Sequence, residues 1–149
     1  MNRPFQRKGS KSNTQVGRVF EAKALKFFRG KGLVLQRNLK LDIGINGTKS
    51  HAFDLGNAKK KVIVECKSNT WTGGGNVPSA KMTAWHQAMY YFHAAPRTYR
   101  KILFVLRDLS KKRNKTLADY FIQASPHLIP ADVEIWEYDE RRGTAVRKL

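Results

Sequence analysis

Residues 50–67 read SHAFDLGNAKKKVIVECK, and this pattern predicts a β-hairpin. Two stretches, 50–55 and 61–67, have the composition of strands, and the segment between them is rich in Gly, Asn and Lys. Apolar and polar side chains alternate in the second strand, so Glu65 and Lys67 point to the same face. A strand with a strong apolar register therefore places a carboxylate beside an ammonium group.

Asp54 lies on the first strand, with ten residues between it and Glu65. If the hairpin turns near residues 57–62, the two carboxylates face each other, and the Cβ atoms of such neighbours are about 4.5–5.5 Å apart. Carboxylates at this distance repel each other unless a cation lies between them. Mg²⁺ suits this position because it needs only one or two carboxylates together with phosphate oxygens and water. The alternative is a salt-bridged cluster on a solvated face of the hairpin.

The rest of the chain predicts one α/β domain, residues 14–149, with a central mixed sheet flanked by helices. It follows a basic, polar segment, residues 1–13, that we expect to form a flexible arm. The order of elements is expected to be α-β-β-β-α-β-α-β. Besides the hairpin, the patterns predict helices at 14–30, 79–95 and 116–124, strands at 33–39 and 102–106, and an edge strand at 133–138.

The charge of the chain favours a polyanionic partner. The 149 residues include 29 Lys and Arg but only 11 Asp and Glu, which gives a formal net charge of +18. Nucleic acid is the first candidate partner and an anionic membrane surface the second. Residues 1–107 contain 21 of the bases and only four acids: Glu21, Asp42, Asp54 and Glu65. Because carboxylates weaken binding to phosphates, each retained acid needs a separate explanation.

Other common classes of site find little support in the sequence. The single cysteine, Cys66, excludes an intramolecular disulfide and agrees with a reducing compartment. It alternates with Val62 and Val64, so we expect it to pack in the core rather than act as a nucleophile. The four histidines show no metal-binding spacing, and the longest apolar run, 102–106, is too short to span a bilayer. We therefore expect a soluble protein of the cytoplasm.

Asp54, Glu65 and Lys67 together resemble the D-x(n)-(D/E)-x-K signature of the PD-(D/E)xK nuclease superfamily. This superfamily has a restriction-endonuclease-like fold with an αβββαβ core, and the predicted element order is similar to it over about residues 14–107. Phe53 stands where the name of the motif has Pro. The resemblance implies a Mg²⁺-dependent endonuclease that hydrolyses phosphodiester bonds in duplex or branched DNA, with Mn²⁺ able to substitute.

The resemblance also implies roles for individual residues of the hairpin. It assigns metal ligation to Asp54, Glu65 and the backbone carbonyl of Cys66, and catalysis to Lys67. Asp42 could replace Asp54 if the hairpin were drawn differently. We prefer Asp54, because it lies in a strand next to a turn, and expect Asp42 to cap the turn at residues 44–47.

Two helical residues complete the predicted site. Many members of the superfamily carry a Glu on the first core helix that reaches the metal, and Glu21 would take this role as a catalytic and metal-binding residue. The alternative for Glu21 is an ion pair with Arg18 or Lys23, or a position at the boundary of the core where the carboxylate faces water. Gln87 and Tyr91 resemble the Q-x-x-x-Y motif of some of these nucleases, which would make Gln87 catalytic. The alternative is that Tyr91 lies in the core and Gln87 on the surface.

Basic residues in three segments are expected to contact nucleic acid, and the sequence leaves the enzyme class open. The contacts are predicted for Arg3, Arg7, Lys8, Lys11, Lys59, Lys60, Lys61, Lys111, Lys112 and Arg113. One such site cuts one strand, so a homodimer or a higher symmetric oligomer is expected for double-strand cleavage. A junction resolvase, a small homing or restriction-type enzyme and a phage recombination nuclease all fit. The alternative function is a non-enzymatic basic nucleic-acid-binding accessory protein, and an RNA substrate remains open.

Overall fold

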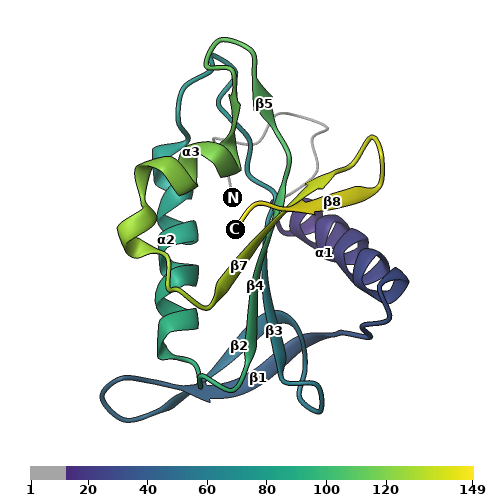
Figure 1. The fold of residues 1–149 in the computed structure, drawn as a ribbon, viewed down its shortest axis with the longest axis vertical. Coiled ribbons are helices and arrows are strands. Elements are labelled where there is room, and N and C mark those ends of the chain that lie inside the picture. The colour runs from purple at the N-terminus through teal and green to yellow at the C-terminus, as the bar shows by residue number, and fades with distance from the viewer. Residues whose placement is uncertain (1–12) are drawn as a thin grey trace, which may run out of the picture.

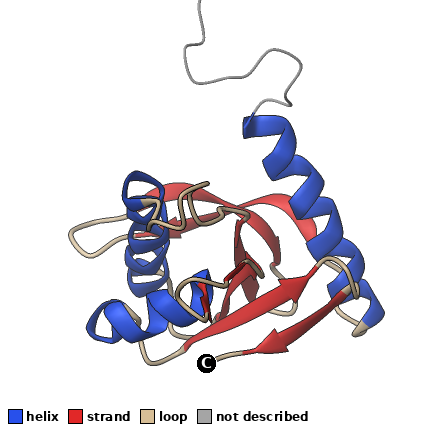
Figure 2. Ribbon diagram, turned by 90° about the horizontal axis from the view of Figure 1, so that it is seen from above, coloured by secondary structure: helices blue, strands red, loops and turns tan. Residues whose placement is uncertain are grey.

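The computed structural model describes residues 13–149 as a six-stranded mixed sheet with helices on both faces (Figure 1). Helix α1 covers one face and helices α2 and α3 cover the other, as the view along the sheet shows (Figure 2). The helices are α1 (Asn13–Gly30), α2 (Ser79–Ala94), α3 (Leu117–Ala124) and a short 3₁₀ turn at Pro126–Leu128. The strands are β1 (Gln36–Ile43), β2 (Lys49–Asn57), β3 (Val62–Lys67), β4 (Arg100–Leu106), β5 (Leu109–Ser110), β6 (Lys115–Thr116), β7 (Val133–Asp139) and β8 (Thr144–Arg147).

The strands of the main sheet are arranged in the order β1-β2-β3-β4-β7-β8. The first three form an antiparallel meander, β3, β4 and β7 run parallel, and β8 returns antiparallel to β7. Strands β5 and β6 form a separate small hairpin. The carboxyl ends of β3, β4 and β7 therefore lie side by side at one end of the sheet, where ligands commonly bind in open α/β folds.

Two hydrophobic clusters hold the helices against the sheet. Trp85 of α2 and Phe121 of α3 are fully buried against the α2-facing side, and their rings meet edge to face with centroids 5.2 Å apart. Phe104 of β4 is fully buried on the other side, where it contacts aromatic rings of α1. Burial of aromatic side chains contributes much of the stability of such layers. The packed sheet therefore holds the residues at the ends of its strands in fixed positions.

Several predicted elements are confirmed, and others need correction. The helices, the hairpin and the order α-β-β-β-α-β as far as β4 agree with the prediction, but the structure adds the strands β5 and β6 before α3 and the strand β8 after β7. The first strand was predicted at 33–39, but β1 spans Gln36–Ile43, because its second half pairs with β2 as far as Lys49. The prediction that 133–138 forms an edge strand is wrong, because β8 pairs with β7 and takes the edge position. The predicted arm lies outside the described residues, except for residue 13, which begins α1.

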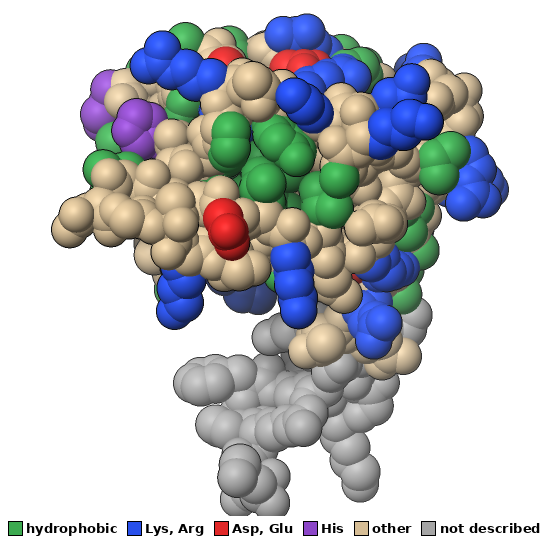
Figure 3. Space-filling model, turned by 90° about the horizontal axis from the view of Figure 1, so that it is seen from below, with side chains coloured by type: hydrophobic (Ala, Val, Ile, Leu, Met, Phe, Trp, Pro, Cys, Tyr) green, Lys and Arg blue, Asp and Glu red, His purple; other side chains and the backbone are tan. Residues whose placement is uncertain are grey.

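The surface reflects the composition of the chain. Lys and Arg side chains are spread over the face seen from below Figure 1, where Asp and Glu are few (Figure 3). Among residues 13–149, no helix combines the length and the apolar character needed to cross a membrane.

Candidate active site

The strands of the central hairpin separate at Asp54. In the described chain β2 pairs with β3 only over Leu55–Asn57, whereas it continues to pair with β1 as far as Lys49. Beyond Leu55, therefore, β2 follows β1 and leaves β3. We call the point at Asp54 where β2 separates from β3 the fork. Here the Oδ2 atom of Asp54 accepts a hydrogen bond from the backbone N–H of Cys66 at 2.8 Å. The bond joins the two strands where their ladder ends and orients the carboxylate toward β3.

Glu65 is a buried carboxylate with a side-chain nitrogen near each of its oxygens. Its Oε1 atom lies 3.2 Å from Nε2 of His51, and its Oε2 atom lies 3.9 Å from Nζ of Lys67. The pKa of Glu65 is raised to about 7: burial is the main cause and the negative charge of Asp54 adds to it, while His51 and Lys67 lower the pKa. A cation bound beside Glu65 would therefore stabilise the ionised form of this carboxyl group.

Asp54 connects this carboxylate with a third one on helix α1. Burial raises the pKa of Glu21, and the charge of Asp54 is the second cause. Glu21 makes an ion pair with Nη1 of Arg37 on β1 at 2.5 Å. The predicted alternatives, ion pairs of Glu21 with Arg18 or Lys23, are not the ones formed. Asp54 thus acts electrostatically on two of the other three acids in residues 1–107.

His51 was not predicted as part of the site. Its ring stacks on that of Tyr91, with centroids 3.9 Å apart and an angle of 25° between the planes. This contact holds the ring against α2 while Nε2 faces Glu65. Tyr91 is therefore half-buried beside the site, whereas Gln87, one turn earlier on α2, is exposed. Of the predicted Q-x-x-x-Y pair, Tyr91 therefore contacts His51, which in turn contacts Glu65.

Asp42 and Cys66 have clear positions. Asp42 is exposed on β1, opposite Ser50, and its side chain makes no hydrogen bond within the described residues, so the predicted turn cap is not formed. Asp42 contributes to none of the raised pKa values at the fork, so Asp54 is the better candidate. Cys66 packs beside the cluster under α1, and burial raises the pKa of its thiol far above the usual range. This agrees with the prediction that it is a packing residue.

The predicted nucleic-acid contacts fall at opposite ends of the sheet. Lys59, Lys60 and Lys61 lie in the turn before β3, at the other end of that strand from Lys67. These three lysines therefore do not flank the carboxylates at the fork.

The loop from Lys111 to Arg113 lies instead at the carboxyl end of the parallel strands. It faces the loop of Gly73, Gly74 and Gly75 across a cavity of about 550 Å³. The Arg113 guanidinium lies 5.1 Å from the centre of the Trp71 ring, and its Nε donates to the Gly75 carbonyl at 2.9 Å. Arg113 thus joins the two loops, while Lys111 and Lys112 remain exposed. Arg3, Arg7, Lys8 and Lys11 lie outside the described residues.

The donor atoms at the fork fit a hard divalent cation. Asp54 and Glu65 offer carboxylate oxygens, which Mg²⁺ prefers, and their mutual repulsion would be relieved by such an ion. Within residues 13–149, no three His, Cys, Asp or Glu side chains are grouped closely enough to hold a metal as they stand. Glu21 would have to leave Arg37 to join the other two. The geometry thus favours a site of two carboxylates completed by water and substrate.

The raised pKa of Glu65 predicts a specific dependence of stability on pH. Between its ordinary pKa of 4.5 and about 7, the folded protein holds the Glu65 proton and the unfolded chain does not. The free energy of unfolding must therefore fall as the pH rises through this window. We expect the wild type to lose up to about 3 kcal/mol relative to Glu65→Gln between pH 4.5 and 7. Urea unfolding in EDTA measures this difference, and parallel pH curves for the two proteins would contradict it.

Comparisons of the chain with protein-family models, with curated proteins and with solved structures found no match. The assignment of roles at the fork therefore rests on the residues and contacts described above.

Proposed function

We propose that this protein is a Mg²⁺-dependent DNA endonuclease with a restriction-endonuclease-like fold. One observation carries the proposal: Asp54, at the fork of a hairpin, acts electrostatically on both Glu21 and Glu65, in a chain with a net charge of +18. If the acids served only solubility or surface ion pairs, they would not need to lie close to one another. A carboxylate whose negative charge raises the pKa values of two neighbouring carboxyls costs stability, which points to a functional reason for its presence.

The arrangement of the sheet supports the proposed fold. The order α1-β1-β2-β3-α2-β4, with an antiparallel meander and β4 parallel to β3, is the αβββαβ order that the sequence resemblance implies. Asp54 lies on the middle strand of the meander, and Glu65 and Lys67 lie on the next strand. Both strands are positions where this fold family carries its motif.

Each residue at the fork has a proposed task. Asp54 and Glu65 would hold Mg²⁺, with the backbone carbonyl of Cys66 as a further ligand. The ion would supply positive charge to the scissile phosphate and lower the pKa of a bound water. Lys67, half-buried beside Glu65, would neutralise charge on the phosphate or orient the attacking water. His51 holds Glu65 in place through the hydrogen bond to Oε1.

Plasmid and branched-DNA cleavage tests the proposal directly. We expect the wild type to convert supercoiled plasmid or a branched substrate to cut products in Mg²⁺ or Mn²⁺, and to be inactive in EDTA. A labelled RNA of the same sequence tests whether the protein cleaves RNA instead of DNA. If no DNA form is cut under any condition while DNA is still bound, the accessory-protein alternative is correct instead.

The contacts to DNA can be located by the salt dependence of binding. The pair Lys111→Ala/Lys112→Ala removes two positive charges beside the carboxyl ends of β3 and β4, and Lys59→Ala/Lys60→Ala removes two at the opposite end of β3. If each lysine contacts a phosphate, the first pair lowers the slope of log affinity against log salt by about 2. The second pair should leave the slope nearly unchanged. Equal effects of the two pairs would show that the binding surface is not confined to the carboxyl end.

A further inference from the structure

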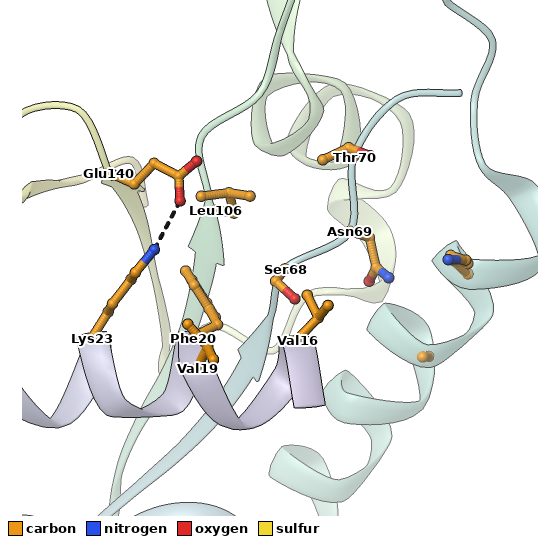
Figure 4. Close-up of a pocket in the computed structure, with 11 residues that line it drawn as sticks. Val16, Val19, Phe20, Lys23, Ser68, Asn69, Thr70, Leu106 and Glu140 are labelled. Carbon is orange, nitrogen blue, oxygen red and sulfur yellow. Dashed lines mark hydrogen bonds and ion pairs between the residues drawn. The ribbon is translucent and has the colours of Figure 1, made fainter. Parts of the chain in front are cut away.

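A cavity of about 570 Å³ is lined by Ser68, the residue that follows Lys67 in the chain (Figure 4). It stands at the carboxyl ends of all three parallel strands, because its lining includes Ser68 after β3, Leu106 at the end of β4 and Glu140 after β7. Its volume is in the range of about 300–1,000 Å³ that ligand pockets occupy. The cavity is therefore placed to receive a part of any substrate whose reacting group is at Lys67.

One wall of the cavity is apolar and is provided by the first turns of α1. Val16, Val19 and Phe20 line it, and both valines are 41% exposed although they stand beside a hydrophobic cluster. Figure 4 shows these side chains rising from α1 beneath the segment of Ser68 and Asn69. A flat apolar group that covers these side chains would remove apolar surface from water, which favours its binding.

The opposite wall is polar and one of its groups has a fixed orientation. Asn69 Oδ1 accepts a hydrogen bond from Nε1 of the buried Trp85 at 2.8 Å, so the amide cannot rotate freely. Its NH₂ group has no acceptor among the described residues and therefore offers donors to a ligand. The hydroxyls of Ser68 and Thr70 lie on the same wall.

The charge near the cavity is positive. Lys81, in the first turn of α2, lines the cavity and makes no ion pair among the described residues. Lys23 also lines it and is paired with Glu140 at 3.0 Å. A ligand for this cavity thus has a flat apolar body, hydrogen-bond acceptors at one edge and an anionic group that can reach Lys81.

We infer that the cavity binds an unpaired nucleobase of the substrate strand, next to the phosphate that is cut. The inference rests on the proposed function, because it places the neighbouring phosphate at Lys67. A base supplies the flat body and the acceptors, and its strand supplies the phosphates. The base can enter only if it leaves the duplex, so the preferred substrate carries a bulged, mismatched or branched nucleotide beside the cutting site.

The test is a binding experiment without metal. Fluorescence anisotropy in EDTA compares a short DNA duplex containing one bulged nucleotide with the fully paired duplex. We expect the wild type to bind the bulged duplex about tenfold more tightly, as is typical for one base held on a protein surface. Ala84→Leu, which adds volume at the cavity wall on α2, should lower this preference to roughly twofold or less. Asn69→Asp, which keeps the acceptor for Trp85 but replaces the free donors, should do the same.

Matched controls separate the cavity from general effects. Ala80→Leu lies one turn from Ala84, outside the cavity lining, and should keep the preference, as should Asn76→Asp in the neighbouring loop. Equal binding of bulged and paired duplex by the wild type, or the same preference in Ala84→Leu and Asn69→Asp, would overturn the inference. So would tight binding of a free deoxynucleotide without any preference for the bulge. Since the measurement needs no cleavage, a bulge preference in a protein that never cuts DNA would support the base site and reject only the nuclease.

Discussion

Replacement of Lys67 by Ala should lower the rate of DNA cleavage by at least about 100-fold while DNA affinity changes little. Nζ of Lys67 lies 3.9 Å from Oε2 of Glu65, where its charge can act on a phosphate bound at the site. One charge among 29 basic side chains contributes little to overall binding. Cleavage rates at saturating protein and affinities in EDTA separate the two effects.

The control for this variant removes the same charge elsewhere. Lys26→Ala alters an exposed residue of α1 and should leave the cleavage rate within about twofold of the wild type, because it is not at the fork. Loss of DNA binding in Lys67→Ala with an unchanged rate for bound DNA would show that Lys67 is a contact residue and not a catalytic one.

The largest expected effect on stability is that of Phe104→Ala, which should lower the free energy of unfolding by about 3–5 kcal/mol. Phe104 is fully buried on β4, and its ring centroid lies 5.5 Å from Phe20, 5.3 Å from Phe28 and 5.5 Å from Tyr138. The substitution leaves a cavity between the sheet and α1 that the surrounding rings cannot close. Urea unfolding at a fixed pH measures the loss.

Val146→Ala is the control for this prediction. Val146 is 63% exposed on the edge strand β8, so its truncation should change the free energy of unfolding by no more than about 0.5 kcal/mol. A loss below about 1 kcal/mol for Phe104→Ala would mean that α1 is not anchored through this cluster. It would also remove the reason for placing Glu21 at the fork.

The sequence was sufficient to predict the hairpin and its two main acids. Regular alternation from Val62 to Lys67 determines which face each side chain occupies, and a short turn brings Asp54 next to β3, where it accepts a hydrogen bond from the backbone of Cys66. The helices followed from their apolar periodicity. These features depend on residues that are near one another in the chain, which is why local patterns reveal them.

Other features depend on contacts that local patterns cannot show. His51 reaches Glu65 only because β2 leaves β3 at Asp54, and the sequence does not show where a ladder ends. The partner of Glu21 is Arg37, 16 residues away on another element, and not a neighbour on the same helix. The edge strand β8 is short and largely exposed, so it lacks the apolar pattern that reveals a buried strand.

The most direct test of the central claim, that Asp54 and Glu65 hold a divalent cation, is paramagnetic broadening of backbone amide signals by Mn²⁺. The amide of Cys66 donates to Asp54, so its signal should be among the first to vanish when substoichiometric Mn²⁺ is added. EDTA should restore the signal, and Asp54→Asn should abolish the effect. The claim is contradicted if the Cys66 signal survives while signals elsewhere are lost, or if Asp54→Asn broadens exactly as the wild type does.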